Sequence, residues 1–598
     1  MRTEPENAQA LLTLGRATVL SGRALEGLVV FDRALSLDPN LAKAHSGRGL
    51  ALAACGRSDE ALAAYQRAAE LDPSDATLFR EIGCLMLRLG RYGNAHAAFA
   101  VALQLDPSDL GALEGRTMTL VAVGRYHEAL PGLQALLSRA PETDYLLGTW
   151  FHARLNCCEW SEFDSVRRSI SEQVARGKRV DTPFTFLAHS ESPVDQQRCA
   201  RLYAADRCAA AVGVAREPTR ATSQRLRVAY LSADFRDHAV GQLMVEILQC
   251  HDRGRIETYG ISTAPSDNSS VRQRLERSLE HFLDVVALQD HAIAERMAQL
   301  SIDIVVDLGG HTAASRTGLL AKRPAPIQVA FLGYPGTSGA GFMDYIVADR
   351  HVIPESEQDS YDEQVIYLPD SYFPPRRPTP LALPVARATA GLPASGFIFA
   401  CFNAPYKLTP ELFGSWMHIL RRVPESVLWI RDTSAAARHN LAREAERHAV
   451  DPMRLIYAPR VASHADHLAR LALADLFLDT YPYNAHTTAS DALRAGVPVI
   501  TLRGRTFASR VATSLLAAVG LDELSNATVE DYVQQAIEVA SSPELATELK
   551  ARLRRSQVSS PLFDPARYCR HLEAAYHEIH ARRLRGERPR LLRVERTI

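Results

Sequence analysis

A period of 34 residues runs through the first quarter of the chain and limits its fold more than any other feature. Three sets of residues keep this step: four glycines each followed by arginine, three aromatic residues with a leucine, and four prolines. They are Gly22, Gly56, Gly90 and Gly124; Phe31, Tyr65, Phe99 and Leu133; and Pro39, Pro73, Pro107 and Pro141. A repeated pair of helices explains all three sets. The glycine ends the first helix in the left-handed conformation, the aromatic residue packs the second helix against the first, and the proline opens the next pair.

These three registers are typical of tetratricopeptide repeats, which have a period of 34 residues. Helical hairpins that arose by chance would not keep three registers through four copies. We therefore predict an α-solenoid over residues 1–141, with an irregular last copy because Pro131 falls inside its second helix. A stack of such repeats forms a concave surface that can hold an extended partner chain. That function is binding, and it leaves any chemistry to the rest of the chain.

Residues 142–224 follow the repeats and begin with an aromatic-rich segment that contains Trp150 and Trp160. The segment then passes through Pro183 to a polar stretch at residues 215–224. We predict further helices that cap the solenoid, followed by a linker.

Composition narrows the class of protein. A length of 598 residues predicts roughly three or four domains, and 46% hydrophobic with 23% charged residues is typical of globular proteins. A formal net charge of −1 gives no overall field that would attract nucleic acid or an anionic membrane. We interpret the one basic run, Arg582 to Arg596, as a solvated terminus.

Cysteine usage and hydropathy bear on the compartment. Nine scattered cysteines without C-x-x-C spacing support neither a zinc site nor a disulfide framework, and unpaired thiols suit a reducing compartment. The N-terminus is polar and unlike a secretory signal, and no apolar run approaches the ~20 residues that span a bilayer. We predict a cytoplasmic protein that binds no metal, no nucleic acid and no membrane.

From residue 225 on, short apolar runs rich in β-branched residues alternate with amphipathic helical segments. The runs are 227–232, 302–308, 328–333, 345–348, 365–368, 397–402, 426–431, 455–459, 476–481 and 498–502. Their continuous apolar character predicts parallel strands covered by helices on both faces. A proline-rich break at 369–384 divides them into two Rossmann-like domains, 225–385 and 386–560, followed by a C-terminal helix and basic tail over 561–598. We expect ligands to bind where the carboxyl ends of the strands meet a cleft.

Two loops that follow predicted strands carry weak signals. Residues 307–312 hold two glycines and His311. Residues 332–339 are glycine-rich but lack the lysine of a phosphate-binding loop. A structural turn is the better interpretation of the second loop from its residues alone.

A third loop, residues 481–496, is more specific, because a helix is predicted to begin near His486, Thr487 and Thr488. The N-terminus of a helix presents N–H groups and a partial positive charge, which suit a diphosphate. The alternative is that one of the threonines only caps the helix, and the residues alone slightly favour that alternative.

Several long motifs resemble the O-linked N-acetylglucosamine transferase family. They are RPAPIQVAFLGYPGTSGAGFMDYI (323–346), FNAPYKLTP (402–410), HADHLAR (464–470), LADLFLDT (473–480) and NAHTTASDALRAGVP (484–498). The similarity covers nearly the whole chain, including SADFRDH (232–238) and SSPLFDPARY (559–568). It implies an α-solenoid of tetratricopeptide repeats followed by a GT-B-type α/β catalytic region of two Rossmann-like domains.

The resemblance also implies roles for single residues. Lys407 would contact the donor phosphates and offset the charge that builds on the leaving diphosphate. Thr487 and Thr488 would bind the phosphates at the helix start, and Asp491 would hold the ribose hydroxyls. His238 corresponds to the active-site histidine of the family, and its neutral ring would accept the proton of the incoming hydroxyl or orient the substrate.

The remaining implied contacts concern the base and the sugar. His467 would stack on the base, with Arg470 and the backbone of Ala462 at its edge. Gly333 and Pro335 would line the sugar pocket. Donor contacts are further implied for three residues: Asn403, His464 and His486.

The implied reaction is an inverting displacement at the anomeric carbon, in which a protein Ser or Thr hydroxyl attacks and a nucleoside diphosphate leaves. Its partners would be a nucleotide sugar, UDP-GlcNAc in the first place, and protein or peptide acceptors held by the repeats. The resemblance implies no cofactor and no metal, since enzymes of this architecture generally stabilise the diphosphate with lysine and a helix terminus.

The chain departs from the animal members of the family at two donor positions, where Ala404 replaces glutamine and His464 replaces lysine. A second hypothesis therefore keeps the mechanism but changes the donor, for example to the GDP-fucose of plant relatives. The repeats depart as well. The animal members line the concave surface with a ladder of asparagines, one on the first helix of each repeat, and here those positions hold Thr13, Gly47, Glu81 and Gly115. A third hypothesis is a non-catalytic scaffold that binds proteins through its repeats.

Overall fold

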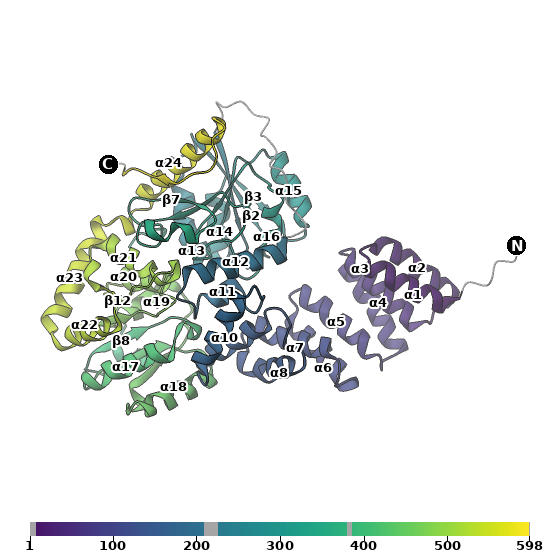
Figure 1. The fold of residues 1–598 in the computed structure, drawn as a ribbon, viewed down its shortest axis with the longest axis horizontal. Coiled ribbons are helices and arrows are strands. Elements are labelled where there is room, and N and C mark those ends of the chain that lie inside the picture. The colour runs from purple at the N-terminus through teal and green to yellow at the C-terminus, as the bar shows by residue number, and fades with distance from the viewer. Residues whose placement is uncertain (1–6, 209–224, 379–384, 597–598) are drawn as a thin grey trace. The chain divides into compact units, whose positions relative to one another are not determined.

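The computed structural model describes residues 7–208, 225–378 and 385–596, and it divides the chain into two compact units, Met1–Leu146 and Leu147–Ile598 (Figure 1). Within the described residues the first unit is entirely helical, and the second contains every strand. The linker predicted at 215–224 lies outside the described residues.

The first unit is a row of helix pairs. The pairs are α1 (Ala8–Leu20) with α2 (Ala24–Leu37), α3 (Ala42–Ala54) with α4 (Ser58–Leu71), α5 (Ala76–Arg88) with α6 (Tyr92–Leu105), and α7 (Leu110–Ala122) with α8 (Tyr126–Arg139). Each repeated glycine follows the first helix of its pair in the left-handed conformation, with φ between 69° at Gly90 and 84° at Gly22. The repeated aromatic rings are buried. The predicted α-solenoid is confirmed, and Pro131 lies inside a continuous α8.

The buried rings close two positions of the asparagine ladder. A Cβ atom placed at Gly47 would lie 2.2 Å from Phe31 Cε1, and one placed at Gly115 would lie 2.3 Å from Phe99 Cζ. Phe31 is 1% exposed and Phe99 is 0% exposed, so neither ring can move aside without disturbing its neighbours. An asparagine side chain therefore does not fit at either position in this arrangement.

Four helices open the second unit and occupy the segment where a helical cap was predicted. They are α9 (Leu146–Asn156), α10 (Phe163–Ala175), α11 (Pro183–Phe186) and α12 (Pro193–Cys208). The short α11 begins at Pro183, and the Thr182 side chain accepts a hydrogen bond from the N–H of Thr185. This segment packs into the same core as the strands that follow.

The first sheet is parallel and eight-stranded, in the order β14-β7-β6-β5-β4-β1-β2-β3. Its strands are β1 (Leu226–Ser232), β2 (Ile256–Ser262), β3 (His281–Asp284), β4 (Ile304–Asp307), β5 (Ile327–Ala330), β6 (Tyr345–Ala348), β7 (Gln364–Tyr367) and β14 (Leu592–Arg593). The chain runs outward from β1 to β3 and then crosses to β4, on the other side of β1. Such a reversal marks the carboxyl ends of β1 and β4 as the place where a ligand binds.

The second sheet is parallel and six-stranded, in the order β10-β9-β8-β11-β12-β13. Its strands are β8 (Ile398–Cys401), β9 (Val427–Arg431), β10 (Leu455–Ala458), β11 (Leu476–Leu478), β12 (Val499–Leu502) and β13 (Ser525–Asn526). The chain reverses again between β10 and β11, so the carboxyl ends of β8 and β11 are adjacent. The prediction of two parallel α/β sheets is confirmed, whereas the residue boundaries of the five predicted domains stay predictions.

Helices accompany both sheets (Figure 1). Those between the strands of the first sheet are α13 (Ala239–Cys250), α14 (Ser270–Ser278), α15 (Asp290–Gln299) and α16 (Thr317–Ala321). Those that follow β8 are α17 (Pro410–Arg422), α18 (Ala435–Arg447), α19 (His464–Leu471), α20 (Thr487–Arg494), α21 (Val511–Val519), α22 (Val529–Ser541), α23 (Pro543–Ser559) and α24 (Pro565–Leu584). The last of these, α24, returns to the first sheet and contacts α13.

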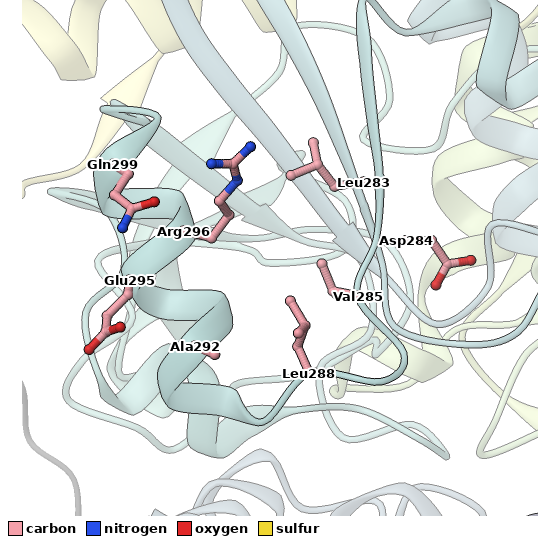
Figure 2. A pocket seen from close by; sticks show the side chains of 8 residues that line it. All are labelled: Leu283, Asp284, Val285, Leu288, Ala292, Glu295, Arg296 and Gln299. Atoms are coloured by element: carbon pink, nitrogen blue, oxygen red, sulfur yellow. The ribbon is translucent and has the colours of Figure 1, made fainter.

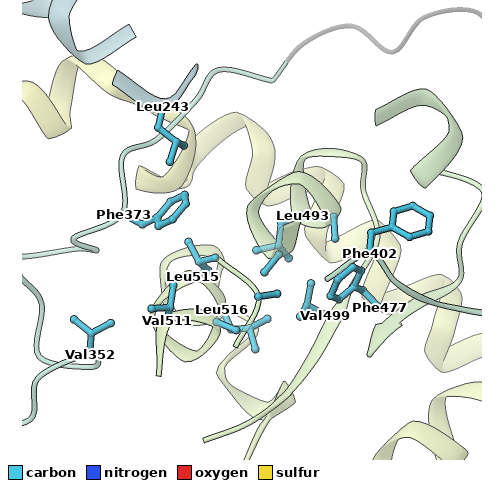
Figure 3. Close-up of a cluster of buried hydrophobic side chains, with 14 of the residues drawn as sticks. Leu243, Val352, Phe373, Phe402, Phe477, Leu493, Val499, Val511, Leu515 and Leu516 are labelled. Carbon is cyan, nitrogen blue, oxygen red and sulfur yellow. The ribbon is translucent and has the colours of Figure 1, made fainter. Parts of the chain in front are cut away.

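One hydrophobic core joins the two sheets (Figure 3). Leu243 on α13, Phe373 in the connection after β7, and Leu515 on α21 belong to the same buried cluster. Tyr372 and Phe373 are 1% and 2% exposed, so the first part of the predicted proline-rich break is a buried connection. This shared core holds the carboxyl ends of the two sheets together within one unit.

Two expectations about strands and the C-terminal segment were incomplete or wrong. Strands β2, β3, β13 and β14 were not predicted. The interpretation of Arg582 to Arg596 as a solvated terminus fits most of its arginines, which are exposed, but not Arg582, which is 7% exposed and donates to the carbonyl oxygens of Arg590 and Leu591. The segment then adds β14 to the edge of the sheet beside β7.

Replacing Gly47 by alanine is expected to destabilise the repeats by about 1–3 kcal/mol, because the new methyl group overlaps the Phe31 ring and outweighs the gain in helix propensity. Gly93→Ala is the matched control, since Gly93 also lies in a repeat helix and a Cβ there has no neighbour within 4 Å. It should stabilise by up to about 1 kcal/mol. Native-state hydrogen exchange of α2 and α3 measures the first effect. Equal protection in Gly47→Ala and the unaltered chain would contradict the packing argument.

Candidate functional site

The candidate site is built where β8 and β11 end. The chain leaves β8 into a turn, η3 (Pro405–Lys407), and leaves β11 into a loop that leads to α20. Asn403 Nδ2 donates to Thr480 Oγ1 across 2.8 Å and so ties the two loops together. Because both loops follow adjacent parallel strands, residues far apart in sequence meet here.

Lys407 is the buried cation of the site. Its side chain is 8% exposed, and Nζ donates to the carbonyl oxygen of Asn484 across 2.7 Å. Nζ also lies 3.8 Å from the centroid of the Tyr483 ring. Burial lowers the pKa of Lys407 to about 7, and the negative charge of Asp479 opposes this shift. A second, mobile anion bound beside this ammonium group would therefore stabilise its charged form.

Asp479 lies beneath the same loop and is fully buried. It accepts hydrogen bonds from Thr501 Oγ1 at 2.6 Å and from the N–H groups of Ala485 and Thr480 at 2.6 and 2.7 Å. Burial raises the pKa of Asp479 to about 7, against these hydrogen bonds and the charge of Lys407. The carboxyl group fixes the path of the backbone that presents the Asn484 carbonyl to Lys407.

The loop that accepts the hydrogen bond of Lys407 leads directly into α20. Its N-cap residue is His486, whose side chain makes no capping hydrogen bond, so the alternative that Thr487 or Thr488 caps the helix is wrong. Thr488 Oγ1 instead donates to Asn403 Oδ1 across 2.5 Å. His486 Nε2 lies 3.3 Å from the Ala508 carbonyl, and burial with the Lys407 charge holds the pKa of His486 well below its usual value. An uncapped helix tip beside a buried ammonium is suited to an anion.

Asp491 lies within α20 and is 5% exposed. Four nitrogen atoms surround its carboxylate: His464 Nε2 at 3.3 Å, Arg494 Nη1 at 3.4 Å, Arg376 Nη1 at 3.7 Å and His467 Nε2 at 4.0 Å. Burial raises its pKa, but positive charge beside the carboxylate, that of Arg376 included, more than offsets the effect and holds the pKa below the ordinary value.

Arg376 and Arg494 were missed by the sequence analysis. Arg494 lies three residues after Asp491 on a predicted helix, and that spacing could have indicated it. Arg376 follows two prolines in a connection between strands, and no local pattern in the sequence points to Asp491. Only the meeting of the two sheets brings it there.

Helix α19 supplies the residues predicted to hold the base. The ring centroid of His467 lies 5.7 Å from that of Phe402, and the Arg470 guanidinium lies 5.3 Å from the Phe402 centroid. Arg470 Nη2 is 3.4 Å from His467 Nδ1, so the two side chains share one face of the helix. Burial lowers the pKa of His467 to about 4, which keeps the ring neutral at physiological pH. Ala462 lies exposed in the segment before α19.

His238 comes from the other sheet, at the start of α13. Its Nδ1 atom accepts a hydrogen bond from the N–H of Val240 at 3.3 Å and lies 3.5 Å from Asp234 Oδ2. Burial lowers the pKa of His238, and Asp234 opposes the shift. The capping bond favours the tautomer with the proton on Nε2, whereas Asp234 would accept a proton carried on Nδ1. The second tautomer leaves Nε2 as a base.

Gly333 and Pro335 lie in the loop after β5. A Cβ atom at Gly333 would lie 2.0 Å from the carbonyl oxygen of Leu308, so close packing on the end of β4 explains this glycine. The neighbouring Tyr334 shares a buried cluster with Tyr483. The loop thus reaches the aromatic ring against which Lys407 lies. His311 Nε2 lies 2.8 Å from the Ser338 carbonyl oxygen, whereas its buried Nδ1 atom has no hydrogen-bond partner among the described residues.

One side-chain trio among the described residues could offer three metal ligands: His251, Cys569 and Glu573. These groups already bond to one another and to Tyr230, with 2.9 Å between His251 Nδ1 and Glu573 Oε1, and 2.8 Å between His251 Nε2 and Tyr230 Oη. The trio fastens α24 to the C-terminal end of α13. His238 lies at the opposite end of that helix, about 20 Å away by helical rise.

A cavity of about 370 Å³ lies at the far edge of the first sheet, between the end of β3 and α15 (Figure 2). Leu283, Val285, Leu288 and Arg296 are among its lining residues. None of the predicted donor-site residues lines it, so this cavity is separate from the candidate site.

Two parallel sheets in one unit, each with a topological reversal at which a ligand can bind, form the GT-B architecture of two Rossmann-like domains. Residues 211–376 and 375–572 match Glycosyl transferase family 41, and residues 42–75 match the tetratricopeptide repeat. The chain belongs to glycosyltransferase family 41.

Individual relatives support this placement. A probable UDP-N-acetylglucosamine–peptide N-acetylglucosaminyltransferase SEC of Arabidopsis thaliana is 35% identical over 464 residues, which are 73% of this chain and 46% of that protein. A UDP-N-acetylglucosamine–peptide N-acetylglucosaminyltransferase of Caenorhabditis elegans is 28% identical over 463 residues, 58% of this chain and 40% of that protein. The chain thus spans less than half the length of these curated relatives.

A solved structure agrees with the fold over nearly the whole chain. A mutant O-GlcNAc transferase of Thermobaculum terrenum matches with a TM-score of 0.62 and 26% identity, covering 97% of this chain and 98% of that one. In the part of the chain that the structure describes, no helix has the length and apolar character needed to cross a membrane.

The affinity for UDP is expected to fall as pH rises from 7 to 9. Lys407, with a pKa of about 7 in the free protein, loses its proton over this range, and a bound diphosphate favours the protonated form. The loss should reach about tenfold per pH unit until the raised pKa of the complex is passed. The nucleotide itself changes little, because phosphate groups of this kind titrate near pH 6. Isothermal titration calorimetry measures the effect.

Lys407→Ala is the control for this pH dependence. It should bind UDP more weakly at pH 7 and lose most of the change between pH 7 and 9. A variant that keeps the full dependence would assign the titration to another group.

Proposed function

We propose that the chain transfers N-acetylglucosamine from UDP-GlcNAc to Ser or Thr hydroxyls of proteins, with inversion at the anomeric carbon. One observation carries the proposal: the buried Lys407 ammonium lies beside the uncapped N-terminus of α20. A leaving diphosphate gains negative charge as its bond to the sugar breaks, and fixed positive groups stabilise that charge. The names of the two relatives indicate the same donor and acceptor class.

The chemical step is a single displacement. The hydroxyl oxygen of the acceptor attacks the anomeric carbon, and the bond from that carbon to the β-phosphate oxygen breaks with its electron pair on the diphosphate. Lys407 and the helix tip formed by Thr487 and Thr488 offset this charge. His238 Nε2 takes the hydroxyl proton in the tautomer whose Nδ1–H faces Asp234, and in the other tautomer it orients the substrate.

The other site residues select and place the donor. Asp491 holds the ribose hydroxyls, and His467 stacks on the base with Arg470 and the Ala462 backbone at its edge. Two further sets have supporting roles: His464, His486 and Asn403 shape the donor pocket, and Gly333 with Pro335 borders the sugar. No metal is needed in this proposal, and transfer should persist in EDTA.

The repeats are proposed to hold the protein acceptor. Gly47 and Gly115 leave no room for asparagine, because Phe31 and Phe99 fill the space beside them. Acceptor binding therefore depends on other side chains of the concave surface than an unbroken asparagine ladder.

A panel of labelled nucleotide sugars, including UDP-GlcNAc and GDP-fucose, tests the proposed function by both donor hydrolysis and protein labelling. Labelling from UDP-GlcNAc is expected. Labelling from GDP-fucose alone would show that the donor is GDP-fucose and not UDP-GlcNAc. Binding of neither UDP nor GDP, in a thermal-shift assay where a ligand at a hundredfold its Kd adds about 2.7 kcal/mol, would favour a scaffold.

Lys407→Ala is expected to lower kcat by about 10²–10³-fold, because one charge that stabilises the transition state is removed. The matched control is Lys550→Ala, which removes a partly buried lysine paired with Asp475 at 2.7 Å, away from the loops of the site. The control should keep the activity of the unaltered chain. Initial rates at saturating UDP-GlcNAc measure both variants, and an unchanged kcat in Lys407→Ala would refute the leaving-group role.

A further inference from the structure

Arg376 makes contacts with both halves of the catalytic unit. It lies in the connection after β7, and its side chain is 12% exposed. Nη1 is 3.1 Å from His464 Nε2 and 3.7 Å from Asp491 Oδ1, both in the second sheet's domain. The same atom is 3.4 Å from Gln242 Oε1 on α13, the helix of the first sheet that begins after His238.

The contacts of His464 fix how the surrounding charges act on Asp491. Its Nε2 atom lies 3.1 Å from Arg376 Nη1 and 3.1 Å from Arg494 Nη1. Guanidinium groups only donate, so His464 Nε2 is the acceptor, and the ring proton is on Nδ1. His464 then has no proton to give to Asp491, although it is 3.3 Å away.

The two arginines are therefore the groups that hold the Asp491 carboxylate. Both approach Oδ1, whereas His467 Nε2 lies 4.0 Å from Oδ2. Arg494 comes from the same helix as Asp491, and Arg376 comes from the connection between the sheets. One carboxylate oxygen is thus held in place while the other stays available to a ligand.

A charge count supports a role in ligand binding. Two guanidinium groups face one carboxylate in this cluster, and Arg376 Nε makes no hydrogen bond to any of the described residues. Burying an arginine without full hydrogen bonding is costly, and an anionic ligand beside it would offset part of that cost. Burial and the nearby Arg494 lower the pKa of Arg376 to about 10, which leaves it protonated at neutral pH.

We propose that Arg376 is a positioning residue for the donor ribose: it holds Asp491 Oδ1 so that Oδ2 meets the ribose hydroxyls, and it links this grip to α13 through Gln242. The proposal rests on the proposed function, because it takes a nucleoside diphosphate as the occupant of the site. The link matters because the N–H of Gln242 donates to the carbonyl oxygen of His238 across 2.9 Å. One guanidinium therefore contacts both the carboxylate of the ribose grip and the helix that begins after His238.

The test compares two probes, UDP and 2′,3′-dideoxy-UDP, which lacks both ribose hydroxyls. Their dissociation constants are measured by isothermal titration calorimetry on the full chain and on Arg376→Ala. The unaltered chain is expected to bind the dideoxy probe at least tenfold more weakly than UDP. Arg376→Ala should bind UDP about tenfold more weakly and distinguish the two probes by less than threefold, because the ribose grip is already lost.

The neighbouring arginine provides a matched control. The Arg377 side chain is 60% exposed and lies 3.7 Å from Glu246, so Arg377→Ala removes the same charge one residue away. It should bind both probes as the unaltered chain does. Arg376→Gln keeps a hydrogen-bonding side chain and is the second variant should Arg376→Ala fail to fold. It carries the same expected loss of discrimination.

The outcomes separate the two proposals. If Arg376→Ala, or Arg376→Gln in its place, weakens UDP and the dideoxy probe equally, the residue is merely structural and the positioning role is refuted. Unchanged binding of UDP refutes it too. Failure of the unaltered chain to bind UDP at all overturns the proposed function together with this inference, and that result is seen before any variant is made.

Discussion

The contact between the Lys407 ammonium and the Asn484 carbonyl is the interaction on which the site depends. A cation with 8% exposure is stable only if its hydrogen bonds are provided for it, and here the loop after β11 does so. Asp479 in turn holds that loop through Thr501 and two backbone N–H groups. The requirement to house one charge thus determines the course of the chain between β11 and α20.

The repeats and the strands could be predicted because their patterns are local. The 34-residue step gives both helices of each pair, and runs such as 345–348 coincide with β6. Strand β3 was not predicted because it lies at a sheet edge, where His281 and Asp284 are exposed and interrupt the apolar run. Strand β14 escaped because two residues carry no periodicity, and only the neighbouring β7 makes them a strand.

The site could be predicted only in part, because sequence patterns are local and the site brings together residues that are far apart in the sequence. Lys407, Thr488 and Asp491 lie in long motifs, and the structure places them on the loops and helix that those motifs suggested. The N-cap alternative failed because the N-cap residue is His486, and Thr488 inside the helix donates to Asn403, a residue far away in the sequence. The role of Arg376 could not be predicted, because its contacts Gln242 and Asp491 are both more than a hundred residues away, one before it and one after it in the sequence.

Strand β14 has a consequence for the order in which the molecule is made. The first sheet begins with β1 but is completed by β14, which is synthesised after the whole of the second sheet. On the ribosome the repeat array can therefore fold as it emerges, since each helix pair contacts its neighbours along the chain. Until β14 has been synthesised, β7 is an unpaired edge of the first sheet, and such an edge can pair with another chain. The time that translation needs to travel from β7 to β14 is therefore an interval in which this edge is open to aggregation.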